Sequence, residues 1–382
     1  MAGELYEYMI GLFITGMIFT SAVIVVPNLS YVNLLYVDQQ QLRNTALEAL
    51  KAMFLDPGYP VDWGSQDPFN QEDVQRFGLA YASSDSFYVS DPDKVQRLVT
   101  ESKEWGYIEY DKMRELLGLE GYGFSLRILP PFNVTFPKKT FDPPNLNFEV
   151  SVTLLDGRPL ANAMVNMMIV YSTKSAQEDL YVEHAQNKKT GSLGTCEVAE
   201  TLDAQKNDIQ DVVAIFKVTM ADVATVVAIY ATTPQEEIVD IHMLGDTISL
   251  WIPGDLPPEE QPEESDWVEN LVTYNGDNFE LIFKGSDKIT YGQGYKLWSK
   301  TFKGLKQKEP ELLILKLWAV PKGEGKRGRR HVVIVGPNPN WMGSRVLQYG
   351  SKPQGVTVKV QRNVIISGMT YIAEMILWKE SL

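Results

Sequence analysis

The feature that most constrains this chain is an uncharged stretch near its N-terminus. Tyr8 to Val37 contains no Asp, Glu, Lys or Arg, and its most apolar part, Tyr8 to Pro27, has the sequence YMIGLFITGMIFTSAVIVVP. At ~1.5 Å per residue, a helix of ~20 apolar residues spans the ~30 Å hydrocarbon core of a bilayer. We therefore predict a transmembrane helix here. A buried helix or a cleaved secretory signal fits less well, because such a signal begins with basic residues.

The helical pattern continues beyond this stretch. Apolar residues recur at three- and four-residue steps from Leu34 to Phe54, interleaved with polar residues, which indicates an amphipathic helix. The turn residues Asp56-Pro57-Gly58 then end it. We predict one helix over residues 1–56. The corresponding localisation is a single-pass protein of the cell membrane with its C-terminal region outside the cytoplasm.

Two sequons of the Asn-x-Ser/Thr type begin at Asn28 and Asn133. They fit an external C-terminal region, and we predict both asparagines as glycosylation sites. The single cysteine, Cys196, excludes a disulfide within the chain.

A series of short motifs follows the helix. They are DPGYPVDW, FGLA, SDPDKVQRL, YDKMRELLGL and GYGFSLRI, and RNVIISGMTYIAEMILW lies near the C-terminus. Together with the N-terminal helix, their order resembles archaeal type IV pilin-like membrane proteins. The resemblance implies a structural surface protein that assembles by packing its N-terminal helices. The chain departs from the family at its start, where no basic residue precedes Gly3.

The uncharged helix also contains small residues at four-residue steps, namely Gly11, Thr15, Gly16 and Thr20. Such small-xxx-small steps allow two helices to approach closely, so we predict these four as helix-association residues. The expected partners are the membrane and further copies or pilin-like proteins that pack against this helix. A chain that remains monomeric is the alternative.

The rest of the chain is predicted to be rich in strands. Pro130 to Pro144 reads as an extended connector, and the stretches DGRPLANAMV and TGSLGTCEV resemble immunoglobulin-like modules. The predicted fold class is α+β: a long transmembrane helix carrying mainly antiparallel β domains, one pilin-like and one an immunoglobulin-like sandwich. The predicted parts after the helix are 57–144 (pilin-like, with the connector), 145–251 (sandwich), 252–265 (an acidic, proline-rich linker) and 266–382 (a C-terminal β domain).

The last run, Tyr371 to Trp378, is apolar on both of its faces, as expected of a strand covered on both sides. Ser367-Gly368 precedes it and predicts a tight hairpin. The strand Phe124–Leu129 has no obvious partner nearby in the sequence. We therefore predict that the C-terminal hairpin joins Phe124–Leu129 in one sheet that lies on the helix segment Leu42–Phe54.

The sequence shows little sign of catalysis. His184, His242 and His331 share no metal-ligand spacing, and no nucleophile motif or cofactor motif stands out, so we predict no enzyme, cofactor or metal site. The net charge of −14 opposes nucleic-acid binding. One loop between two strands is strongly basic, and we consider it either a solubilising loop or a contact for an acidic partner; its residues include Lys326, Arg327, Arg329 and Arg330.

These observations predict a structural, pilin-like cell-surface protein that acts as a filament subunit or as an accessory to assembly or adhesion. The alternative is a monomeric, membrane-anchored binding module that recognises a ligand or a glycan through its immunoglobulin-like region.

Overall fold

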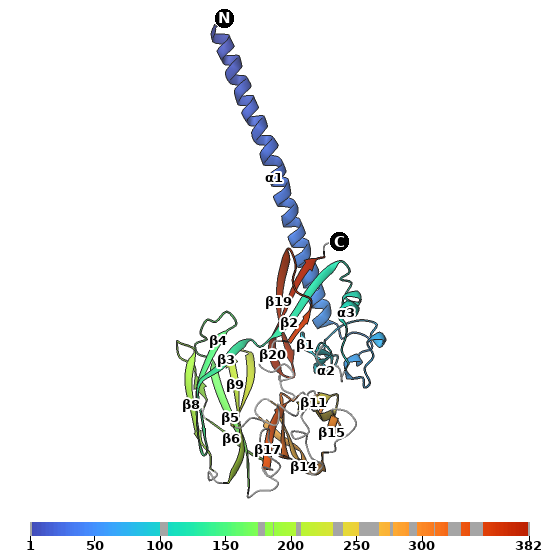
Figure 1. The fold of residues 1–382 in the computed structure, drawn as a ribbon, viewed down its shortest axis with the longest axis vertical. Coiled ribbons are helices and arrows are strands. Elements are labelled where there is room, and N and C mark those ends of the chain that lie inside the picture. Colours follow the sequence, from blue (N-terminus) through green and yellow to red (C-terminus); the bar gives the residue numbers. More distant parts are fainter. Residues whose placement is uncertain are drawn as a thin grey trace, which may run out of the picture.

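The structure is a computed structural model (Figure 1). It describes residues 2–99, 106–174, 180–185, 187–203, 208–231, 240–251, 267–275, 278–289, 296–308, 310–319, 330–336 and 347–380. Side chains are described for these residues except 2–8, 21–36, 240, 251, 275, 296–297, 319 and 330. A long helix projects from a head that consists mainly of β-sheets.

Helix α1 (Ala2–Leu55) is continuous, and its N-terminus lies far from the head (Figure 1). Its last turns belong to the core of the head: Leu42, Ala46 and Leu50 are at most 3% exposed and are spaced so that they share one face. The helix stops where the sequence predicts. Oδ1 of Asp56 accepts a hydrogen bond from the backbone N of Gly58 at 2.7 Å, and Gly58 has a φ of +76°.

The prediction of a transmembrane helix is wrong. No helix in the described part of the chain has a stretch that is both long and apolar enough to cross a membrane. The predicted fold class and the single-pass membrane localisation are therefore corrected. The described chain is mainly β, with one long helix and a few short ones.

The helix packs on a five-stranded sheet, which we call the helix-bearing sheet. Its strand order is β1-β19-β20-β2-β18, and α1 contacts β19 and β20. The β1–β19 pair is parallel and the other pairs are antiparallel. The strands are β1 (Val89–Ser90), β2 (Tyr122–Leu129), β18 (Leu347–Gly350), β19 (Thr357–Ile366) and β20 (Met369–Lys379).

This arrangement confirms the predicted pairing of the C-terminal hairpin with the strand after Gly123. In register, Phe124 lies opposite Leu377 and Leu126 opposite Met375. The turn of the hairpin is Ser367-Gly368, with φ values of +48° and +75°, as two-residue hairpin turns require. The sheet covers the buried face of α1, so residues from both ends of the chain complete one core.

Only one face of β20 is fully covered, in contrast to the prediction. Tyr371, Ala373, Met375 and Leu377 are buried, whereas Ile372 and Ile376 on the other face are partly exposed. A buried carboxylate occupies the centre of that second face. Glu374 contacts Nη1 of Arg127 at 3.2 Å, Nζ of Lys359 at 2.5 Å and Nε2 of Gln361 at 2.7 Å. These long polar side chains cover part of the second face of β20, where the sequence predicts apolar neighbours.

Replacing Glu374 with glutamine should lower the stability of the head at pH 7 by roughly 1–3 kcal/mol, because Lys359 and Arg127 lose their charged partner. Burial raises the pKa of Glu374, but the hydrogen bonds and positive charges of its neighbours outweigh burial and hold that pKa below its ordinary value. A depressed carboxylate pKa stabilises the fold above the unfolded-state value, and this stabilisation disappears as the pH falls through the folded-state pKa.

Denaturant unfolding of both proteins at a series of pH values measures this effect. The difference between wild type and Glu374→Gln should shrink as the pH falls from 7 into the acid range. Glu380→Gln, which removes a carboxylate that is 41% exposed and paired with Arg114, is the control. A difference that does not change with pH would contradict the assigned charge state of Glu374.

Between α1 and β2 the chain forms short helices and loops. The helices are η1 (Trp63–Ser65), η2 (Gln71–Asp73), α2 (Pro92–Gln96) and α3 (Tyr110–Leu116). Trp63 is completely buried and donates its indole N–H to the carbonyl of Gly78 at 3.0 Å. Asp91 caps α2 by accepting from the backbone N of Asp93 at 3.0 Å.

The remaining strands of the described chain form four further sheets, and each is antiparallel. The first sheet is β3 (Phe132–Asp142), β4 (Asn145–Leu154) and β8 (Thr195–Thr201). The second is β10 (Val223–Tyr230), β9 (Ile209–Met220), β5 (Met164–Thr173) and β6 (Leu180–His184), with β7 (Lys188–Lys189) also on β5. The third is β14 (Asn278–Lys288), β13 (Trp267–Asn275), β16 (Leu312–Ala319) and β17 (Arg330–Gly336). The fourth is β11 (Asp240–Leu244), β12 (Thr247–Trp251) and β15 (Lys296–Thr301), and the short helix η5 (Lys306–Lys308) follows it.

These four sheets lie in consecutive layers. Phe148 of the first sheet packs on Phe216 of the second, with 5.1 Å between ring centroids. The other face of the second sheet shares a core with the third, because β17 contacts both β5 and β9 and their apolar side chains belong to one cluster. Leu271 and Leu315 of the third sheet then share a core with Ile248 of the fourth. Among the described residues, the apolar side chains of these sheets therefore form three core clusters, one at each interface between consecutive sheets.

The segment predicted as an extended connector is instead strand β3, which pairs along its length with β4. The prolines that flank it favour an extended backbone, and Phe136 packs on Phe216 at 4.8 Å between ring centroids. The predicted acidic linker, 252–265, lies outside the described residues. The other predicted domain bounds stay predictions.

Candidate functional site

The N-terminal part of α1 exposes an unusual amount of apolar surface. From Met9 to Phe19, large apolar side chains are between 51% and 79% exposed; they are Met9, Ile10, Leu12, Phe13, Ile14, Met17, Ile18 and Phe19. We call residues 9–20 the exposed helix segment. Since monomeric proteins in water rarely expose large contiguous apolar patches, this segment is a candidate contact surface.

All four predicted helix-association residues lie on the exposed helix segment. A Cβ atom added at Gly11 or Gly16 would meet nothing within 4 Å. The hydroxyl of Thr15 donates to the carbonyl of Gly11 at 2.8 Å, and that of Thr20 to the carbonyl of Gly16 at 2.6 Å. The threonine hydroxyls are thus satisfied within the helix, so another helix could cover them without leaving a buried donor unpaired.

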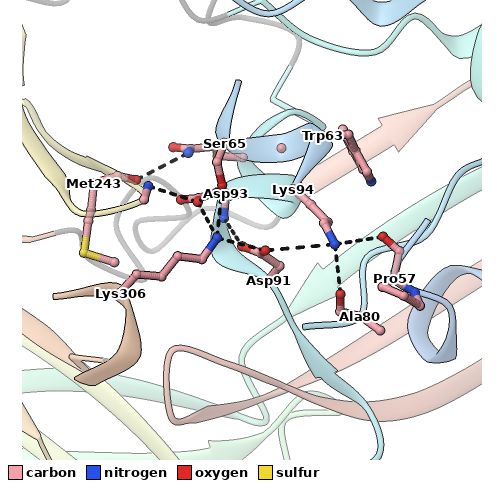
Figure 2. A network of polar contacts seen from close by, with 12 residues as sticks. Pro57, Trp63, Ser65, Ala80, Asp91, Asp93, Lys94, Met243 and Lys306 are labelled. Carbon is pink, nitrogen blue, oxygen red and sulfur yellow. Dashed lines mark hydrogen bonds and ion pairs between the residues drawn. The ribbon is translucent and has the colours of Figure 1, made fainter. Parts of the chain in front are cut away.

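A second candidate is a buried group of charged residues where the loops after α1 meet the fourth sheet. It consists of Ser65, Asp91, Asp93, Lys94 and Lys306, and we call it the junction cluster (Figure 2). Nζ of Lys306 lies 3.0 Å from Oδ2 of Asp91 and 2.6 Å from Oδ2 of Asp93. Asp93 also accepts from Oγ of Ser65 at 2.5 Å and from the backbone N of Gly245 at 3.0 Å.

The electrostatics of the junction cluster follow from burial and from mutual pairing. Burial alone would lower the pKa of Lys306, but the carboxylates of Asp93 and Asp91 outweigh it and raise that pKa. Burial and the neighbouring charge of Asp93 raise the pKa of Asp91. The cluster thus contains a tightly held lysine between two carboxylates.

Lys94 of the junction cluster and the neighbouring Arg97 are also buried cations. Lys94 is 0% exposed and donates to the carbonyls of Pro57 at 2.8 Å and Ala80 at 3.0 Å (Figure 2). Burial lowers its pKa. Arg97 donates to the carbonyls of Gly64 at 2.9 Å and Gln66 at 2.6 Å, and burial lowers its pKa to about 10. Both cations hold irregular loops in place by satisfying their backbone carbonyls.

The junction cluster has little room for a ligand. The cavity beside Lys306, lined in part by Tyr81 and Met243, has a volume of about 10 Å³, which is about the space of one water molecule. Ligand pockets for organic molecules are larger by more than tenfold. The charged atoms described above are directed at one another and at backbone groups, so we interpret the cluster as a polar lock between two parts of the head.

Of the other predicted site residues, only Asn133 has a side chain that the structure describes. Asn133 is exposed on β3, and Asn28 lies in α1 where side chains are not described. Lys326, Arg327 and Arg329 lie outside the described residues, and Arg330 begins β17 without a described side chain. Among the described residues, no three His, Cys, Asp or Glu side chains are grouped as metal ligands.

Sequence reasoning missed the junction cluster. The SDPDK segment was considered only as part of a motif that resembles pilin-like proteins, although it contains two aspartates and a lysine within five residues. Lys306 is more than two hundred residues away in the sequence, so no local pattern predicts its contact with Asp93.

Comparisons with known proteins give no family. No family model matches the chain, and no curated protein matches it. Among solved structures, the chain is similar to invasin, a bacterial integrin-binding protein, at 12% sequence identity with a TM-score of 0.17. The match covers 64% of this chain, which spans 54% of the length of the invasin chain. We base no argument on this distant similarity, and the pilin resemblance of the sequence has no matching family model or curated relative.

Proposed function

We propose that this chain is a non-enzymatic binding protein that associates through the N-terminal part of α1 and presents its β head at the other end of that helix. The observation that carries the proposal is the exposed helix segment. Each large apolar side chain there would contribute roughly 1.5–3 kcal/mol if a partner buried it fully. The acidic net charge of −14 supports a partner other than nucleic acid.

A second copy of the same helix is the partner that best fits this segment. Gly11 and Gly16 leave open backbone surface, and the hydroxyls of Thr15 and Thr20 are satisfied internally. Close helix packing uses such small residues, because they allow the two backbones to approach. The order of motifs that resembles pilin-like proteins supports the same mode of assembly.

Replacing Gly16 with leucine should weaken the association of full-length chains at least about tenfold, which corresponds to ~1.4 kcal/mol. A leucine side chain would prevent close approach at this position. If the chains instead associate by non-specific clustering of apolar surface, the added leucine side chain should strengthen their association. Sedimentation velocity over a range of protein concentrations distinguishes the two outcomes.

The matched control is Ile18→Leu, which changes the shape of an exposed side chain in the same segment but not a small residue. It should associate as the wild type does. A wild-type chain that is monomeric throughout would contradict helix packing and would favour the monomeric binding module. A Gly16→Leu chain that associates more strongly would also contradict helix packing, but would indicate non-specific clustering.

A second candidate function, recognition of a ligand by the head, is favoured by two exposed leucines. Leu155 is 46% exposed and Leu193 is 76% exposed. Their turns are neighbours, because the backbone N of Val152 donates to the carbonyl of Gly194 at 2.8 Å and that of Leu154 donates to the carbonyl of Arg158 at 2.8 Å. Apolar side chains on adjacent turns at one end of a β-sandwich are suited to contact a partner.

This second function is tested by measuring binding of the full chain to a panel of glycans and purified proteins. Leu193→Asp should abolish a wild-type signal. Leu281→Asp, at an exposed position on β14, is the matched control and should retain it. Equal binding by both variants would exclude these turns as the recognition surface.

A further inference from the structure

A second buried charged group lies between the second and third sheets. Its members are Glu269 and Asn270 on β13, Lys316 on β16 and His331 on β17. Lys316 is 0% exposed, and the other three are at most 7% exposed. A lysine amine this deeply buried is unusual in a protein core and needs close polar partners.

The strand register places two side chains against the same lysine. Asn270 lies directly opposite Lys316, whereas Val268 lies opposite Leu317, so Glu269 is the extra residue of a β-bulge. At a bulge, two residues of one strand oppose one residue of the other. The Cβ atoms of directly opposite residues are ~4.5–5.5 Å apart, a separation that a lysine side chain is long enough to span.

The carboxylate of Glu269 is held in a fixed position beside the lysine. Its Oε2 lies 3.5 Å from Nζ of Lys316 and 2.7 Å from Nδ1 of His331. Its Oε1 accepts a hydrogen bond from the indole of Trp267 at 3.3 Å. The ring of Trp318 lies 4.8 Å from the ring of His331. The amine therefore has a proton acceptor at hand in surroundings from which water is largely excluded.

We propose that Lys316 and Asn270 form an intramolecular isopeptide bond, with Glu269 as the proton-transfer group. Glu269 takes a proton from the ammonium of Lys316, and the neutral Nζ attacks Cγ of Asn270. The bond between Nζ and Cγ forms as the second proton of Nζ passes to Nδ2, and the bond between Cγ and Nδ2 then breaks and releases ammonia. Glu269 gives the first proton to this ammonia, so the products are a secondary amide and ammonium, and the reaction needs no oxidant or other reactant.

Burial favours the cross-linked product over the unreacted ion pair of Lys316 and Glu269. An uncross-linked Lys316 keeps a charge in a low-dielectric interior, whereas an amide is neutral and only needs hydrogen bonds. The cross-link would join β13 to β16 at the centre of the third sheet, where β17 in turn contacts β5 and β9 of the second.

Intact mass spectrometry of the full-length protein, purified without denaturation, tests the proposal. The wild-type mass should be lower than the sequence mass by one molecule of ammonia. A protease digest should contain one branched peptide that joins the segments of Asn270 and Lys316. Linear peptides containing unmodified Asn270 and unmodified Lys316, recovered from folded wild-type protein, would overturn the proposal without any variant.

Two variants extend this test. Glu269→Gln keeps both reacting groups but removes the proton acceptor, so its mass should equal the sequence mass. Lys316→Met keeps the volume of the side chain and removes the nucleophile, with the same result. A wild-type mass lower by one molecule of water, with a link from Lys316 to Glu269, would overturn the assignment of Asn270 as the acceptor.

Discussion

Replacing Asp93 with alanine is expected to lower the free energy of unfolding by roughly 3–5 kcal/mol, as when one partner of a buried ion pair is removed. The carboxylate is 0% exposed and joins three separate segments through Ser65, Gly245 and Lys306. Without it, the amine of Lys306 loses its closest partner. Denaturant unfolding measures the loss, and hydrogen exchange should become faster at Gly245.

A double-mutant cycle with Lys306→Met separates pairing from other effects. The double variant should lose less stability than the sum of the two single variants, because either change alone leaves an uncompensated charge. Glu48→Ala removes a carboxylate that is 72% exposed and paired with Lys51 on the surface of α1. It should change stability by less than ~1 kcal/mol. An Asp93→Ala effect no larger than this control would show that the junction cluster is not a lock.

Removing residues 362–382 should have a still larger effect and unfold the helix-bearing sheet. The deletion takes away β20, which lies between β19 and β2, and exposes apolar side chains of α1 such as Leu50 and Phe54. Each such side chain contributes roughly 1.5–3 kcal/mol when buried, so several together exceed the net stability of a typical domain. Hydrogen exchange should accelerate in residues 42–54 and 124–129.

A chain that ends at Lys379 is the matched control, because it keeps β20 and loses only the residues after that strand. Its exchange pattern should match that of the full chain. Unaltered protection of residues 42–54 after the larger deletion would mean that α1 folds against β2 without the C-terminal hairpin.

The pairing in the helix-bearing sheet was predictable because each partner carries a local pattern. The run Tyr371 to Trp378 is too apolar for an exposed strand, and Phe124–Leu129 lacks a neighbouring partner. The turn at Ser367-Gly368 fixes the hairpin between the run Tyr371 to Trp378 and the strand that precedes that run. The buried face of α1 was likewise visible from the spacing of Leu42, Ala46 and Leu50.

The parts that sequence reasoning missed depend on contacts between distant residues. Strand β3 contains Pro137 and several charged residues, so its pattern is weaker than that of a typical strand, and its pairing with β4 decides its conformation. The burial of Lys94, Lys306 and Lys316 is set by carboxylates and carbonyls elsewhere in the fold. Charged residues are normally exposed, so a sequence gives no reason to place these three inside.

The position of β19 and β20 in the chain also governs how the protein must be made. The residues that cover the apolar face of α1 are synthesised about 300 residues after the helix itself. At ~5–20 residues per second of synthesis, Leu50 and Phe54 wait on the order of a quarter of a minute to a minute for their final neighbours. During translation the apolar face of α1 therefore remains uncovered in the nascent chain. Folding in the cell depends on keeping that helix from aggregating until the last strand leaves the ribosome.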